Sequence, residues 1–310
     1  MWEVKVGRER VKHFSVPLLL FFLLILLSIE HIRAESGRDT LVIAYTANLN
    51  ANLQPCGCGD VDLGGLTRIA GVVEKLREKY PDLVLLDAGD WLNSFPLTET
   101  DTLVAKILGS LPYTAINLGD QEFVEGEGFL TEIKKRYGLP LLSASFQKWD
   151  SSKGQPGVLF KTVSGFKLLI YAYCSPKTFT FLEPPQISEG FSGRILSDFP
   201  ANLAEQTDLM VILAHDRILN LPQIQLPRKI PQIWIAGHTQ ERIAIETESG
   251  LVLEPGMDGE YLGLLKVFRN SRGKLNWKNT FLPMDEQITE SGRVKMMVTR
   301  FFRMLSTQPQ

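Results

Sequence analysis

The chain has 310 residues, of which 44% are hydrophobic, and its formal net charge is −2. This length allows one large α/β domain or two smaller ones. Basic and acidic residues nearly balance and form no basic stripe, so the composition gives no indication of a nucleic-acid partner. It is the composition of an ordinary globular protein.

The amino terminus has the pattern of an export signal. Four basic side chains within residues 1–12 precede an apolar run at 16–27, and this run is shorter than the roughly 20 residues of a membrane-spanning helix. We expect a signal peptide at 1–34, cleaved after Ala34. Because Ile32 is a poor residue two positions before that site, an uncleaved signal anchor is the alternative. In either case the folded part is expected to be periplasmic or extracellular, and the membrane is a partner only through an uncleaved segment.

The first half of the chain alternates apolar runs with helical periodicity, which is typical of an α/β fold. Strands are expected at 41–45, 83–86, 115–118 and 141–144. Helices are expected at 64–80, around 103–108, and at 128–137. The unbroken run at 83–86 fits a strand that is buried on both faces.

The second half reads mainly as strands. A hairpin is expected over 158–173, followed by a long surface excursion at 178–199. Further strands are expected at 209–214, 233–236, 244–247, 251–254 and 262–267, and a helix is expected over 285–306.

Polar side chains follow several of these strands. The candidates for metal binding are Asp90, Asp120, His215 and His238. Open α/β sheets place their ligands beyond the carboxyl ends of strands, so we expect these groups to meet at one edge of one sheet. Two carboxylates and two imidazoles suit a transition metal, whereas each residue taken singly is equally well explained by a turn or a buried hydrogen bond.

Three cysteines are present: Cys56, Cys58 and Cys174. An odd number in an exported chain leaves at least one thiol without an internal partner. A disulfide within Cys56-Gly57-Cys58 would be strained, so this pair is a candidate for metal ligation or redox exchange; simple packing beside a glycine-rich turn is the alternative.

The motifs, in their order and spacing from about 40 to 285, resemble the calcineurin-like metallophosphoesterase domain, and most of all the amino-terminal half of bacterial 5′-nucleotidases and UDP-sugar hydrolases. They are Thr46-x-Asn48-x-Asn50, Gly64-Gly65-Leu66, Asp87-Ala88-Gly89-Asp90, Gly119-Asp120-Gln121-Glu122-Phe123, His215 and Gly237-His238-Thr239-Gln240. The Cys56-Gly57-Cys58 loop also resembles that of a less-characterised exported subgroup. The family's second, substrate-binding domain is not expected within this chain.

The resemblance implies a four-layer α/β/β/α sandwich over residues 39–285, with a carboxyl-terminal helix at 286–310. It also implies two metals bridged by one Asp, which is Asp90 here. The second metal site is matched by Asp90, Asp120, His215 and His238.

The other metal site is degenerate by the same comparison. Its positions hold Asn48, Asn50 and Gln240 beside Asp90, so that three of the four ligands are neutral amides. Gln121 stands where the family has a leaving-group His, and Glu122 follows it in the same loop. We therefore expect one divalent transition metal, Zn, Mn or Fe, in a nearly neutral site that hydrolyses phosphomonoesters poorly.

Three functions remain open from the sequence. The first is an exported 5′-nucleotidase-like phosphoesterase of nucleotide catabolism, which acts on a phosphate ester or nucleotide-like small molecule while Asn48, Asn50 and Gln240 donate hydrogen bonds in the emptied site. The second is a non-catalytic protein that binds a metal or a phosphate ligand. The third is a thiolate or redox centre that uses Cys56 and Cys58.

Overall fold

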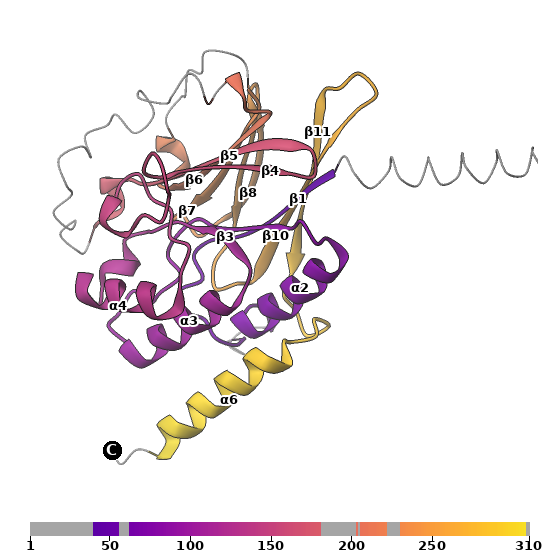
Figure 1. The fold of residues 1–310 in the computed structure, drawn as a ribbon. Coiled ribbons are helices and arrows are strands. Elements are labelled where there is room, and N and C mark those ends of the chain that lie inside the picture. Colours follow the sequence, from indigo (N-terminus) through magenta and orange to yellow (C-terminus); the bar gives the residue numbers. More distant parts are fainter. Residues whose placement is uncertain (1–39, 56–61, 181–202, 204, 222–229, 308–310) are drawn as a thin grey trace, which may run out of the picture.

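The computed structural model describes residues 40–55, 62–180, 203, 205–221 and 230–307. Two β-sheets pack face to face, and helices cover the outer face of one of them (Figure 1). The predicted signal segment at 1–34 and the Cys56-Gly57-Cys58 loop lie outside the described residues. Within the described residues, no helix is both long and apolar enough to span a bilayer.

The first sheet has the strand order β11-β10-β1-β2-β3. Its strands are β1 (Thr40–Thr46), β2 (Val84–Asp87), β3 (Tyr113–Ile116), β10 (Tyr261–Arg269) and β11 (Leu275–Pro283). β1, β2 and β3 run parallel, whereas β10 pairs antiparallel with β1 and β11 pairs antiparallel with β10. The carboxyl ends of the three parallel strands therefore lie at one edge.

The second sheet has the order β4-β5-β6-β7-β9-β8. Its strands are β4 (Val158–Val163), β5 (Phe166–Cys174), β6 (Leu209–His215), β7 (Gln232–Gly237), β8 (Arg242–Thr247) and β9 (Gly250–Pro255). The four inner strands are parallel, and β4 and β8 pair antiparallel at the two edges.

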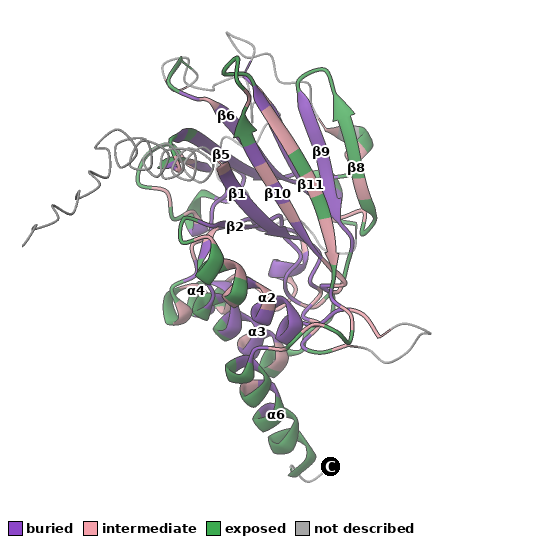
Figure 2. Ribbon diagram, turned by 90° about the vertical axis from the view of Figure 1, so that its right-hand side faces the viewer, coloured by how far each residue is buried: buried purple, intermediate pink, exposed green. Residues whose placement is uncertain are grey.

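In the described part of the chain, three helices cover the outer face of the first sheet and a fourth, α6 (Gly292–Thr307), packs against two of them. The three are α2 (Leu66–Lys79), α3 (Thr98–Ser110) and α4 (Glu127–Tyr137). α6 contacts α2 and α3 with its first turns and then runs past them, so its last turns are largely exposed (Figure 2).

The alternation of side chains along β1 explains its unbroken apolar sequence. Leu41 and Ile43 face the second sheet, while Val42 and Ala44 face the helices. Successive strand residues point to opposite faces, so a strand covered on both sides must be apolar throughout. The outer face of the second sheet is covered as well, because its side chains, such as Ile212, are buried in a third apolar cluster. The predicted α/β class with two sheets and helices is confirmed.

Four details of the sequence prediction were wrong. The polar strand ends belong to two facing sheets rather than one. Residues 141–144 form a single bridge to Ile116 and then cross to the second sheet, where Ala144 N–H donates to Ala172 O. β11 was not predicted, because its half-exposed residues mix polar and apolar types. The last helix begins at 292 rather than 285, since the Ser291 hydroxyl accepts from Val294 N–H and caps it.

Asn117 joins the two sheets directly beneath the edge where the parallel strands end. It follows β3, is fully buried, and donates from Nδ2 to the carbonyl oxygens of Tyr173 at 2.8 Å and Leu213 at 3.3 Å in the second sheet. A buried carbonyl without a donor loses free energy, so this amide fixes the spacing of the two strand ends.

We predict that Asn117→Ala lowers the free energy of unfolding by about 2–3 kcal/mol, because it leaves the buried Tyr173 and Leu213 carbonyls without this donor. Urea unfolding followed by circular dichroism measures the change. Asn276→Ala on the half-exposed strand β11 is the matched control and should stay within about 0.5 kcal/mol of the parent protein. Equal, small effects of both substitutions would contradict the proposed role of Asn117.

Candidate metal centre

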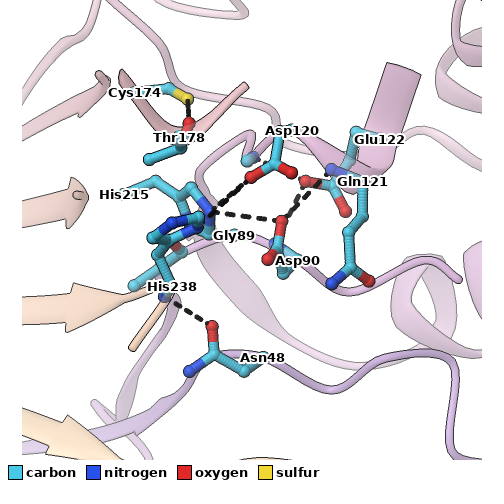
Figure 3. A network of polar contacts seen from close by, with 12 residues as sticks. Asn48, Gly89, Asp90, Asp120, Gln121, Glu122, Cys174, Thr178, His215 and His238 are labelled. Atoms are coloured by element: carbon cyan, nitrogen blue, oxygen red, sulfur yellow. Dashed lines mark hydrogen bonds and ion pairs between the residues drawn. The ribbon is translucent and has the colours of Figure 1, made fainter. Parts of the chain in front are cut away.

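Two carboxylates from the first sheet meet two imidazoles from the second. Asp90 follows β2 and Asp120 follows β3, whereas His215 is the last residue of β6 and His238 follows β7. One ligand atom from each of the four side chains lies within 4.8 Å of all the others. Figure 3 shows them pointing toward a common centre. The structure thus brings together all four residues singled out from the sequence.

The geometry around His215 is that of a metal-binding imidazole. Its Nδ1 lies 3.1 Å from the carbonyl oxygen of Ala88, which can only accept, so Nδ1 carries a proton. Its Nε2 lies 3.2 Å from a carboxylate oxygen of Asp90 and 3.2 Å from one of Asp120. A lone pair facing two carboxylate oxygens requires a cation between them, either a proton or a metal ion.

One further contact in the cluster has the spacing of two ligands around one ion. His238 Nδ1 lies 3.4 Å from Asp120 Oδ1. Tetrahedral ligands about 2.1 Å from a Zn²⁺ ion are about 3.4 Å apart. These residues therefore fit a single divalent metal.

The electrostatics of the cluster favour a bound cation. Burial opposes charge on His215, but the Asp90 and Asp120 carboxylates raise its pKa well above its ordinary value. Burial likewise opposes charge on Asp120, yet hydrogen bonds and charge from His215 and His238 bring its pKa below the ordinary range. Without a metal, the two carboxylates hold a proton on His215; a metal ion would replace that proton.

Two glycines leave the space that the side chains of the cluster occupy. A Cβ on Gly119 would lie 2.7 Å from Cε1 and 2.8 Å from Nε2 of His215, and would also overlap a carboxylate oxygen of Asp90. A Cβ on Gly89 would lie 2.8 Å from Nδ1 of the same imidazole. The carboxylates and the imidazole can approach one another only because these positions lack side chains.

Backbone strain is concentrated around this centre. Seven of the eight non-glycine residues with positive φ in the described chain lie in its loops: Asn48, Asn50, Ala51, Asp90, His238, Gln240 and Asp258. Such conformations cost of order 1–3 kcal/mol each and persist where surrounding contacts impose them, typically at functional sites. Here the ladder bonds from Asn48 N–H to Gly89 O and from Asn50 N–H to Asp90 O tie the loops together.

Glu122 holds the loop that carries Asp90. Its buried carboxylate accepts from the backbone N–H groups of Asp90, Trp91 and Leu92, and from that of Gly119. Burial and the Asp90 charge raise its pKa to about 8, while hydrogen bonds from the backbone oppose that rise. Glu122 is thus a positioning residue, and it makes no contact with the cavity.

The amides at the other metal position are engaged in hydrogen bonds of their own. Asn48 donates from Nδ2 to Glu254 Oε1 and to Gly256 O, both at 3.0 Å, and accepts from His238 N–H. Asn50 donates to Asp258 Oδ1 at 2.8 Å. The prediction that these amides donate into the emptied site was wrong for Asn48, because both hydrogens of its NH₂ group already have acceptors within the protein. For Asn50, whose NH₂ group has one such acceptor, it is still a prediction.

Glu254 and Asp258 are site residues that the sequence analysis missed. Glu254 is buried, and it accepts from Asn48, from Thr239 and from the backbone of Gln240. Burial raises its pKa, and these donors oppose the rise. The only available signal was the position of Glu254 at the end of the strand predicted at 251–254.

Gln121 is buried beside Asp90. Its backbone N–H donates to Asp90 Oδ1 at 3.2 Å, and its Nε2 donates to Asn50 Oδ1 at 3.1 Å. An amide has no proton to give to a leaving group, so the structure provides no general acid at this position.

Cys174 ends β5 beside His215, but it is not a ligand in this structure. The thiol is fully buried and lies 3.5 Å from the Thr178 hydroxyl. Burial raises its pKa to about 12. A thiol in such surroundings is inert. The proposed roles of Cys56 and Cys58 concern residues outside the described part of the chain.

A cavity of about 650 Å³ opens onto the four-residue cluster. Asp90, Asp120 and His238 line it, together with Asn50 and Gln240 of the other metal position that the resemblance implies. Its volume suits a small-molecule ligand, so a ligand in this cavity would meet the metal position directly.

Comparison with known proteins relates this chain to phosphoesterases. The chain is 24% identical over 313 residues to a snake venom 5′-nucleotidase of Crotalus adamanteus, covering 86% of this chain and 51% of that protein. The structure of a 5′-nucleotidase precursor from Thermus thermophilus superposes with a TM-score of 0.68 at 19% identity, covering 86% of this chain and 59% of that one. The calcineurin-like phosphoesterase YfkN from Bacillus subtilis superposes with a TM-score of 0.61 at 19% identity, covering 86% of this chain and 97% of that one.

The chain has the calcineurin-like phosphoesterase fold. Its sequence is similar to those of 5′-nucleotidases, and it spans about half the length of the curated proteins it matches. No family model matches the sequence. The resemblance found from the motifs is confirmed at the level of this fold and these relatives, whereas assignment to a Cys-Gly-Cys subgroup is still a prediction.

We predict that Gly119→Ala weakens binding of Zn²⁺ or Mn²⁺ at least 100-fold, because the added methyl group would displace the imidazole of His215 and the carboxylate of Asp90. Equilibrium dialysis against a metal buffer measures the affinity. Gly128→Ala in the first turn of α4 is the matched control, since nothing lies within 4 Å of its Cβ position. Unchanged metal affinity in a folded Gly119→Ala protein would contradict the assigned cluster.

Proposed function

We propose that this chain binds one divalent transition metal through Asp90, Asp120, His215 and His238 and uses it to hydrolyse phosphate esters. The observation that carries the proposal is the fixed tautomer of His215, whose Nε2 faces two carboxylate oxygens at 3.2 Å. When bound, the metal would act as a Lewis acid toward a phosphoryl oxygen and lower the pKa of a water molecule.

The protein's own groups would orient this chemistry. The Ala88 carbonyl holds His215 so that Nε2 points to the metal position. Glu122 accepts hydrogen bonds from four backbone N–H groups. These bonds fix the position of Asp90 and of the Gly119 turn that precedes Asp120. Orientation of ligands by such outer contacts typically changes metal affinity or activity 10–100-fold.

A single ion is favoured over a pair because the other metal position holds neutral amides, and the amide of Asn48 is already hydrogen-bonded through both its nitrogen and its oxygen. Its Nδ2 has two acceptors, and its Oδ1 accepts from the backbone of His238 at 2.7 Å. The two-sided clamp of a dinuclear site is then absent, and with Gln121 at the acid position we expect slow turnover. Reaction with nucleotide-like esters is part of the proposal and is supported by the names of the relatives.

Export of the chain also belongs to the proposal. It is supported by the basic and apolar segments at 1–27 and by the relative from snake venom.

We predict that Asp90→Asn and His215→Ala each reduce bound metal at least 100-fold and abolish turnover of nitrophenyl phosphate esters, because each removes a ligand from a set of four. Metal content after dialysis and the release of nitrophenolate are the two measurements. Asp82→Asn, in the exposed turn before β2, removes the same charge at the opposite end of the strand and should leave both values unchanged.

The same experiment separates the alternatives. Metal bound by the parent protein without any turnover would contradict the catalytic part of the proposal and leave a binding protein. If the Asp90→Asn protein retained its metal and the Cys56→Ser protein lost it, the thiolates rather than the assigned residues would be the metal ligands.

A further inference from the structure

The cavity over the metal position has an unusual charge. Its described lining contains three carboxylates, those of Asp90, Asp120 and Asp258, and neither lysine nor arginine. A phosphate-binding cavity ordinarily provides basic side chains or a second metal to offset the ligand's negative charge.

Asp258 determines the net charge of this site. One divalent ion offsets the charges of Asp90 and Asp120, because His215 and His238 bind a metal as neutral imidazoles. The Asp258 carboxylate then leaves the cavity with a net charge of −1. The buried carboxylates of Glu122 and Glu254 lie outside the cavity lining and could only make this sum more negative.

Asp258 is held in place rather than free to swing away. Its backbone N–H donates to Asn48 O at 2.8 Å, and its carbonyl accepts from Gly65 N–H. Its Oδ1 accepts from Asn50 Nδ2 at 2.8 Å, and Asn50 in turn accepts from Gln121. This chain of hydrogen bonds fixes a negative charge beside the emptied metal position.

One part of the cavity wall is apolar. Pro96, Val124 and Met257 line it, and Pro96 and Met257 are exposed at its mouth. A ligand whose phosphate reaches the metal position could place an uncharged organic group against this wall. A phosphate monoester has one such group, whereas a phosphodiester has two and carries one negative charge fewer.

From these observations we infer that the site selects phosphodiester monoanions over phosphomonoester dianions and that Asp258 is the specificity-determining residue. The inference rests on the proposed function of the metal centre. Hydrolysis of a diester consumes one water, breaks one P–O ester bond, and gives an alcohol and a monoester. That monoester is a dianion at neutral to alkaline pH, so the site that accepted the diester would reject its product and the reaction would stop after one bond.

The test uses bis(p-nitrophenyl) phosphate and its product p-nitrophenyl phosphate with the full, Mn²⁺-loaded chain. We expect a higher kcat/KM for the diester and the release of one nitrophenolate per diester molecule. Asp258→Asn keeps an oxygen that accepts from Asn50 and removes the charge, so it should raise the monoester-to-diester ratio of kcat/KM about tenfold, the effect of one charge in a partly solvated site. Asp82→Asn should leave the ratio unchanged.

A binding measurement gives a readout independent of turnover. Calorimetry at pH 8 with inorganic phosphate, mostly a dianion, and dimethyl phosphate, a monoanion, should show the ratio of the two affinities shifting toward phosphate by about tenfold in Asp258→Asn. A parent protein that prefers the dianion in both assays, or ratios unaffected by Asp258→Asn, would overturn the inference while leaving the metal centre intact. Metal content is recorded for each protein: a chain that binds no metal would overturn the proposed function and this inference with it.

Discussion

The placement of the His215 imidazole between a carbonyl and two carboxylates is the constraint on which the site depends. The Ala88 carbonyl comes from the loop after β2, the carboxylates come from the loops after β2 and β3, and the imidazole comes from the facing sheet. These groups meet only if the carboxyl ends of the parallel strands in both sheets lie at one edge. Two residues hold these strand ends together. Asn117 hydrogen-bonds from the first sheet to the second next to that edge, and Glu122 hydrogen-bonds to the loops of the first sheet.

Asn48 and Asn50, which the motif resemblance places at the other metal position, are hydrogen-bonded within the protein. A buried Asn48 and a half-buried Asn50 without partners would destabilise the fold. Instead, Asn48 and Asn50 are hydrogen-bonded to Glu254 and Asp258, which lie in the segment from β9 to β10. Through these hydrogen bonds, the amides hold the loop that carries His238 close to the end of β1. A carboxylate placed back at 48 would face Glu254, so restoring the second site would require more than one substitution.

The sequence predicted the parts of this protein that follow from local pattern. Apolar runs identified β1, β2, β3, β6 and β7, and the polar residues at or after the ends of these strands included all four members of the metal cluster. The pattern could not show that the strands form two sheets, because alternation within a strand does not reveal its neighbours. Nor could it find the partners of Asn48 and Asn50, which lie more than 200 positions away in the sequence. β11 escaped notice because an edge strand with half-exposed faces lacks a buried run.

Diffraction from crystals of the Mn²⁺- or Zn²⁺-loaded protein, recorded at the absorption edge of the metal, tests the central claim most directly. The account predicts one anomalous peak per chain, about 2.0–2.2 Å from ligand atoms of Asp90, Asp120, His215 and His238. A second peak of comparable height beside Asn48, Asn50 and Gln240, or a single peak bound elsewhere, would contradict it.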